Sequence, residues 1–164
     1  MLTSISSYFD WIEGKIRKAT QIDLKSLCCF RVVFGLFVML FLWSKYAWLG
    51  AVPDAIFSPP MLSLASLFRE FPSPFFFHAI DLAIGISTIT LTIGLFTRLS
   101  TVLLLTLLII GNSFSYSLGK IDHSILYPCV LLTMSFQDWG TMFSIDAVFR
   151  KRSKARNYNT ENYS

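Results

Sequence analysis

The stretch Ser115-Tyr-Ser-Leu-Gly-Lys-Ile-Asp-His-Ser124 separates two apolar runs and decides how the second half of the chain folds. It carries a lysine, an aspartate and one of only two histidines within four residues. A short polar segment that ends one apolar run and precedes another predicts two separate helices. We therefore expect the hydrophobic segments of the chain to pack around this stretch.

The composition of the chain is that of a membrane protein. Hydrophobic residues make up 54% of the sequence and charged residues only 15%, against about 25% charged residues in a typical soluble domain. Most of the charge lies at the two termini, and the net charge of +4 comes from them. Such basic ends suit an anionic membrane surface. No nucleic-acid-binding motif is visible, so we expect a lipid bilayer and no nucleic acid as the surroundings.

Four apolar runs predict an all-α, polytopic membrane protein with four transmembrane helices. The runs cover approximately residues 27–49, 75–96, 99–118 and 123–143, and about 20 residues suffice to cross the hydrocarbon layer. The fourth run is the least regular, since its apolar core is only 12 residues long. Pro128 near its start lacks an N–H and so frees the carbonyl of Ser124 for another donor.

Three further segments complete the predicted organisation. Residues 1–26 form a basic, amphipathic lead-in, predicted as an interfacial helix, with a soluble helix or a disordered segment as alternatives. Residues 27–149 form the membrane domain, with a short interfacial helix after the first span. Residues 150–164 form a basic tail, predicted to be disordered and cytoplasmic.

The basic residues also predict the orientation. Ten Lys and Arg residues lie in the terminal flanks and in the turn after the second span, against three on the other side. Because basic residues favour the cytoplasmic side, both termini are predicted to be cytoplasmic. Four spans agree with this placement, and we expect a multi-pass protein of the cell inner (plasma) membrane.

The helix directions bring a set of polar residues to the predicted outer end of the bundle. Ionisable groups within a membrane are costly and indicate either function or mutual pairing. We take as candidate catalytic residues Lys120 and His123. The candidate ligand-binding residues are His78, Asp81, Asn112 and Asp122. The alternative is an ordinary hydrated loop beside a hydrogen-bonded helix contact between His78 and Asp81.

A second polar group is predicted at the inner end. Arg31 lies about one turn inside the first span, where an acidic partner would compensate its charge. We expect Asp138 or Asp146 to form a structural pair with it. No spacing typical of a metal site is present, and we predict none.

Several short motifs, in their order and spacing, resemble the membrane domain of vitamin K-dependent gamma-carboxylase and its bacterial relatives, the HTTM (horizontally transferred transmembrane) family. These motifs are Arg31-Val-Val-Phe-Gly-Leu36, Gly94-Leu-Phe-Thr-Arg-Leu-Ser100, Asn112-Ser-Phe-Ser-Tyr-Ser-Leu-Gly-Lys-Ile-Asp-His123 and Ser144-Ile-Asp146. The similarity covers about residues 27–147.

The resemblance implies a possible chemistry for the outer loop. In the carboxylase a lysine of this loop deprotonates vitamin K hydroquinone, and Lys120 occupies the corresponding place. His123 resembles the histidine that follows that lysine. The cofactor is unknown from the residues themselves, but the resemblance implies a quinone or hydroquinone.

Two functions of different class follow. The first is an accessory membrane subunit of a maturation, secretion or redox complex, which works with a protein partner or as a homo-oligomer. The alternative is a carboxylase-like or quinone-linked membrane enzyme with Lys120 as base. The large extracytoplasmic region of the carboxylase has no counterpart in these 164 residues, which favours the subunit.

Overall fold

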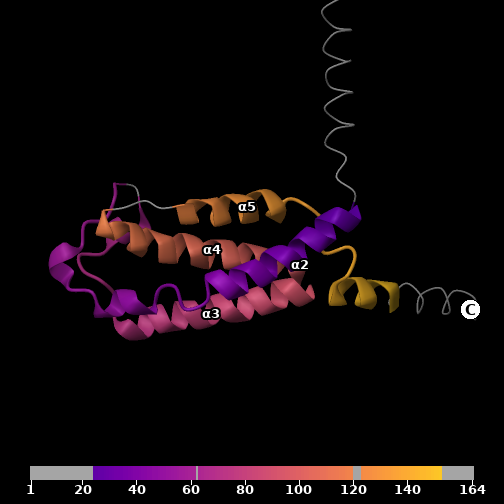
Figure 1. Cartoon of the computed structure of the whole chain (residues 1–164), viewed down its shortest axis with the longest axis horizontal. Coiled ribbons are helices and arrows are strands. Elements are labelled where there is room, and N and C mark those ends of the chain that lie inside the picture. The colour runs from indigo at the N-terminus through magenta and orange to yellow at the C-terminus, as the bar shows by residue number, and fades with distance from the viewer. Residues whose placement is uncertain (1–23, 62, 120–122, 153–164) are drawn as a thin grey trace, which may run out of the picture.

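The computed structural model describes residues 24–61, 63–119 and 123–152. Within these ranges the regular elements are all helical, and four α-helices lie side by side (Figure 1). They are α2 (Leu24–Phe41), α3 (Pro74–Ile93), α4 (Thr97–Ser115) and α5 (Leu126–Ser135). A further helix covers residues 145–152. The predicted lead-in helix and most of the predicted C-terminal tail lie outside the described residues.

Three of these helices have the length and composition of membrane spans. They are Leu24–Phe41, Pro74–Ile93 and α4 with its short extension, Thr97–Leu118. The fourth predicted span does not form one long helix, because α5 has only 10 residues. At 1.5 Å per residue it is about 15 Å long, about half the hydrocarbon thickness. The structure therefore supports three spanning helices rather than the predicted four.

The first span is also shorter than predicted. Helix α2 ends at Phe41 rather than near Leu49, and Ser44 adopts a left-handed backbone conformation with φ of 59°. The chain between α2 and α3 then forms three short 3-10 helices, η1 (Ala47–Ala51), η2 (Asp54–Ile56) and η3 (Leu64–Leu67). The single interfacial helix expected after the first span is thus not observed in the described residues, since η3 covers only four residues.

Helix α3 lies at the centre of the packing, against α2 and α4, and α5 packs on α4. Small residues allow these close approaches: a Cβ added at Gly35 of α2 would lie 2.1 Å from Thr92 Oγ1 of α3. Gly94 ends α3 in a left-handed conformation with φ of 77°, which glycine adopts without steric cost. Helix α4 restarts three residues later, as the predicted tight turn requires.

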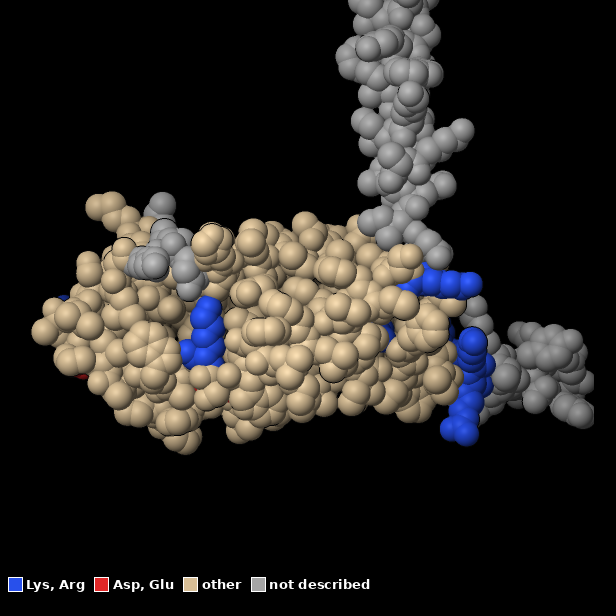
Figure 2. Space-filling view, viewed as in Figure 1, with Lys and Arg blue, Asp and Glu red and all other residues tan. Residues whose placement is uncertain are grey.

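The outer surface of the bundle is apolar. Large hydrophobic side chains on all four helices point outward, including Leu40, Leu82, Leu103 and Leu132. In Figure 2 most of the visible face carries no charged side chain; several Lys and Arg side chains lie at the end from which the helix 145–152 extends, and one basic side chain lies toward the opposite end. An apolar middle with a basic end is the distribution expected for a helical protein in a bilayer.

The two ends of the described chain lie at the same end of the bundle. Residues 136–144 continue from α5 back to the beginning of α4, where the indole Nε1 of Trp139 donates to Thr101 Oγ1 at 3.2 Å. The helix 145–152 then begins near the first turns of α2 (Figure 1). The short α5 and the irregular segment after it therefore return the chain along the bundle together.

Candidate functional site

Asp81 lies at the end of the bundle where α2 passes into η1. Its carboxylate is 7% exposed and accepts hydrogen bonds from the main-chain N–H of Tyr46 at 3.1 and 3.2 Å and of Ala47 at 2.7 Å. These amides begin η1, where N–H groups have no partner within the helix. The carboxylate of α3 therefore acts as a cap for a distant segment of the chain.

A second hydrogen-bonded chain of side chains crosses the bundle beside this cap. The Tyr46 hydroxyl donates to Asn112 Oδ1 at 2.7 Å, and the Ser124 hydroxyl donates to the same oxygen at 3.1 Å. Tyr116 Oη lies 3.0 Å from Ser124 Oγ. Tyr46, Asn112 and Ser124 are all buried. The network ties the α2–η1 connection to the end of α4 and the start of α5.

The carbonyl freed by Pro128 belongs to this network. Asn112 Nδ2 donates to the main-chain oxygen of Ser124 at 3.4 Å. The carbonyl of Ser124, predicted to be available to another donor, thus accepts a hydrogen bond from a side chain of α4.

The predicted outer residues do not all meet. Asp81 and Asn112 are buried and bonded through Tyr46, whereas His78 and His123 are exposed. Lys120 and Asp122 lie outside the described residues. In the part of the chain that the structure describes, the arrangement joins two of the six candidates and leaves both histidines on the surface.

Arg31 is the most deeply buried charged residue at the opposite end, with 0% exposure. Its guanidinium donates to the main-chain oxygen of Trp139 at 3.1 Å and to that of Phe143. These carbonyls belong to residues 136–144, which are not helical and so lack the usual intrahelical donors. Arg31 supplies hydrogen bonds that an α-helix would have provided within itself.

The predicted acidic partners of Arg31 are occupied elsewhere. Asp146 accepts hydrogen bonds from the N–H of Phe96 at 2.9 Å, and from the N–H and hydroxyl of Thr97 at 2.8 and 2.9 Å. Asp138 is exposed. The two groups still belong to one cluster, because Gly94 packs against Arg31 and its carbonyl accepts from the N–H of Asp146 at 3.1 Å. Arg31 thus binds carbonyls and Asp146 binds amides and a hydroxyl, while the two charges still interact electrostatically. A direct ion pair between them stays a prediction.

Asp146 caps the start of α4, where the helix dipole favours a negative charge. Burial raises the pKa of its carboxyl. The hydrogen bonds from Thr97 and Phe96 and the nearby Arg150 outweigh burial, so the pKa of Asp146 lies below its usual value. The carboxyl is therefore ionised at neutral pH.

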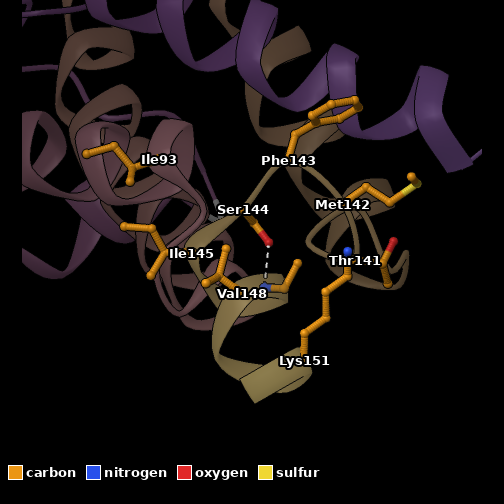
Figure 3. Close-up of a pocket in the computed structure, with 9 residues that line it drawn as sticks. Ile93, Thr141, Met142, Phe143, Ser144, Ile145, Val148 and Lys151 are labelled. Atoms are coloured by element: carbon orange, nitrogen blue, oxygen red, sulfur yellow. Dashed lines mark hydrogen bonds between the residues drawn. The ribbon is translucent and has the colours of Figure 1, made fainter. Parts of the chain in front are cut away.

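Two of the cavities at this end of the bundle have charged residues in their lining. A polar cavity of about 210 Å³ contains Arg98, Gln137, Asp138, Asp146 and Arg150 in its lining. A larger and mainly apolar cavity of about 550 Å³ is lined mostly by residues 141–148 (Figure 3). Its lining residues are Ile93, Thr141, Met142, Phe143, Ser144, Ile145, Ala147, Val148 and Lys151. Ser144 sits between them, and its hydroxyl accepts from the N–H of Ala147 at 3.0 Å.

Sequence reasoning missed the residues that hold these clusters together. Tyr46 and Trp139 were not among the predicted site residues, yet both are 1% exposed. A partial signal for Tyr46 was present in Gly111, because a Cβ there would lie 2.5 Å from the Tyr46 ring. The partners of Arg31 are main-chain carbonyls, which no residue pattern reveals.

Among the described residues, no group of three or more His, Cys, Asp or Glu side chains is placed to hold a metal ion. Comparison with protein-family models, with curated proteins and with solved structures found no match to this chain. The class of protein therefore follows from the fold itself: the described residues form an all-helical structure in which three helices are long and apolar enough to cross a membrane.

Proposed function

We propose that this chain is an accessory membrane subunit, of the HTTM-like type, in a maturation, secretion or redox complex of the cell membrane. The observation that carries the proposal is the use of the buried polar groups. Asp81 caps η1, Asn112 joins Tyr46 to Ser124, and Arg31 binds carbonyls of residues 136–144. In the described residues these polar groups stabilise the packing of the chain. This is the role that a non-catalytic subunit requires of its buried polar side chains.

The apolar exterior supports the same proposal. A subunit binds its partner through side chains that point away from its own core, and every long helix of this bundle presents such side chains. Helix–helix association within a bilayer relies on close packing rather than on the hydrophobic effect. The face that a partner covers is therefore defined by shape and must be found by experiment.

Photo-crosslinking from each helix tests the proposal. A photoreactive phenylalanine analogue is introduced singly at Leu40, Leu82, Leu103 or Leu132, all of which are exposed. In native membranes we expect one polypeptide of constant mass to be captured from neighbouring positions on one face. The other positions serve as matched controls and should yield lipid adducts only. Lipid adducts from all four positions would contradict the proposal.

The enzyme alternative predicts a different result. If Lys120 is a base acting on a quinone or hydroquinone, Lys120→Ala abolishes a quinone-dependent activity of the purified chain while Lys120→Arg retains the fold without the activity. His123, which is exposed next to Ser124 of the buried network, would then be the second residue to replace. A purified chain with such an activity and no captured partner would replace the subunit proposal by the enzyme.

A further inference from the structure

The 550 Å³ cavity has the features of a lipid-binding site. Its volume lies within the range of about 300–1,000 Å³ that is usual for small-molecule sites. Ile93, Phe143, Ile145 and Val148 form most of its apolar lining. Lys151 is the charged residue among the nine that line it, and none of the nine is acidic.

The position of the cavity in the bundle matches the boundary of a bilayer. Ile93 is the last residue of the spanning helix α3, so the apolar lining begins where a hydrocarbon layer would end. Lys151 lies further along the helix 145–152, and its side chain is directed back toward Thr141 (Figure 3). An apolar space next to the membrane with a cation in its lining matches a phospholipid, which joins an apolar acyl chain to an anionic phosphate.

A second apolar cavity extends the first toward α2. It measures about 300 Å³ and is lined by Cys29, Val32, Val33 and Phe143. Phe143 lines both cavities and has a left-handed backbone with φ of 50°, which is uncommon for a bulky residue. Its ring points toward α2 in Figure 3. The apolar surface thus continues from the helix 145–152 to the spanning helix α2.

Asp146, which follows the lining residue Ile145 in the chain, does not neutralise the charge of Lys151. Asp146 directs its carboxylate to the N–H groups of Phe96 and Thr97 and lines the polar cavity, not the apolar one. Arg150 lies at the same polar cavity beside Asp146. The positive charge of Lys151 is therefore the one that faces a ligand in the apolar cavity.

From these features we infer that the cavity between Ile93 and Lys151 binds an anionic phospholipid, with an acyl chain against Phe143 and Val148 and the phosphate at Lys151. The occupant is a membrane lipid rather than free phosphate, because most of the lining is apolar. It would fasten the irregular segment 136–144 to the leaflet on this side of the membrane.

Native mass spectrometry of the full chain in detergent tests the inference. Phosphatidylglycerol and phosphatidylcholine with identical acyl chains are titrated separately. Because a single Lys near a membrane surface contributes about fivefold in affinity for anionic lipid, we expect phosphatidylglycerol to bind about fivefold more tightly. Glycerol 3-phosphate should not displace it, and displacement would show that the site recognises phosphate alone.

Matched variants separate a built site from diffuse attraction. Lys151→Gln should remove the preference for phosphatidylglycerol, while Arg98→Gln, which removes an equal charge at the same end outside this cavity, should keep it. Val148→Trp should fill the cavity and weaken both lipids, with unchanged helicity by circular dichroism. Lys151 is exposed, so Lys151→Gln should leave the fold intact. If Val148→Trp unfolds, the comparison of Lys151→Gln with Arg98→Gln still tests the inference. Equal binding of the two lipids, or an equal effect of the two Gln variants, would overturn the inference.

Discussion

At the scale of single residues, the two buried charged side chains of the long helices both stabilise backbone outside the helices. Asp81 accepts from the amides at the start of η1, and Arg31 donates to carbonyls of residues 136–144. A buried charge is tolerated only when hydrogen bonds compensate its loss of hydration. Each charged side chain here also pairs with main-chain groups that would otherwise lack a partner. The same hydrogen bonds therefore offset both the lost hydration of the charge and the cost of burying unpaired main-chain groups.

Replacing Arg31 should therefore destabilise the bundle. Arg31→Met leaves the carbonyls of Trp139 and Phe143 without their side-chain donor, and each unsatisfied buried group costs about 1–3 kcal/mol. We expect a loss of at least about 2 kcal/mol in the free energy of unfolding, measured by thermal unfolding in detergent. Arg98→Met at an exposed site should change it by less than about 0.5 kcal/mol. Equal effects of the two variants would show that Arg31 has no special role.

Asp146 makes the stability depend on pH. Its pKa in the folded protein is lowered below the ordinary value of about 3.9. Its contribution is therefore complete above that ordinary value and is lost as the pH falls through the lowered pKa. We expect Asp146→Asn to cost about 1 kcal/mol at neutral pH, as other caps do, and the difference from the original chain to narrow on acidification. The control is Asp138→Asn, an exposed substitution; a pH-independent difference for Asp146→Asn would contradict the assignment.

At the scale of elements, the connection between α2 and α3 is held by a residue of α3 and by the network through Asn112. The sequence predicted that Asp81 and Asn112 lie at the same end of the bundle, and both do. It placed the end of the first span near residue 49, because the apolar run of about residues 27–49 is long enough to cross the hydrocarbon layer. The helix ends earlier because Asp81 binds the amides of Tyr46 and Ala47, which stabilises a new turn there.

Asp81→Asn should loosen this connection. An amide retains one acceptor oxygen, but its NH2 group cannot accept from the second N–H. We expect faster hydrogen exchange at the amides of Tyr46 and Ala47, together with a loss of about 1–3 kcal/mol in stability. The exchange of amides in the middle of α4 should be unchanged. Unaltered exchange at Tyr46 and Ala47 would show that the carboxylate does not hold the turn.

At the scale of the whole molecule, the chain returns to its starting end although, among the described residues, only three helices are long and apolar enough to span. Helix α5 covers part of the distance, and residues 136–144 cover the rest while bound to Arg31 and Thr101. Non-helical backbone is tolerated beside lipid only where protein or water satisfies it. The two ends of the described chain therefore lie at the same end of the bundle, and the placement of both termini in the cytoplasm stays a prediction.

Cysteine labelling tests that orientation. In a variant without the native cysteines Cys28, Cys29 and Cys129, His123→Cys should react with a membrane-impermeant maleimide added to intact cells. Lys151→Cys should react only after the cells are permeabilised. Both sites are exposed in the structure, so membrane sidedness and not burial decides the result. Reaction of Lys151→Cys in intact cells would reverse the proposed orientation.

The sequence alone determined the helical class, the apolar character and the approximate bounds of the second and third spans, because these depend on local runs of side chains and on the length needed to cross a bilayer. The end of the first span and the short fourth helix were not determined by it. Only the tertiary structure decided which buried groups meet. Arg31 binds carbonyls more than 100 residues away, and Asp81 binds amides 35 residues away. Main-chain donors and acceptors are present at every residue, so no pattern of side chains can mark the ones that remain unpaired after packing. For the same reason the sequence predicted an acidic partner for Arg31. In the folded protein its hydrogen bonds go to main-chain carbonyls of residues 136–144, which do not continue the helix α5.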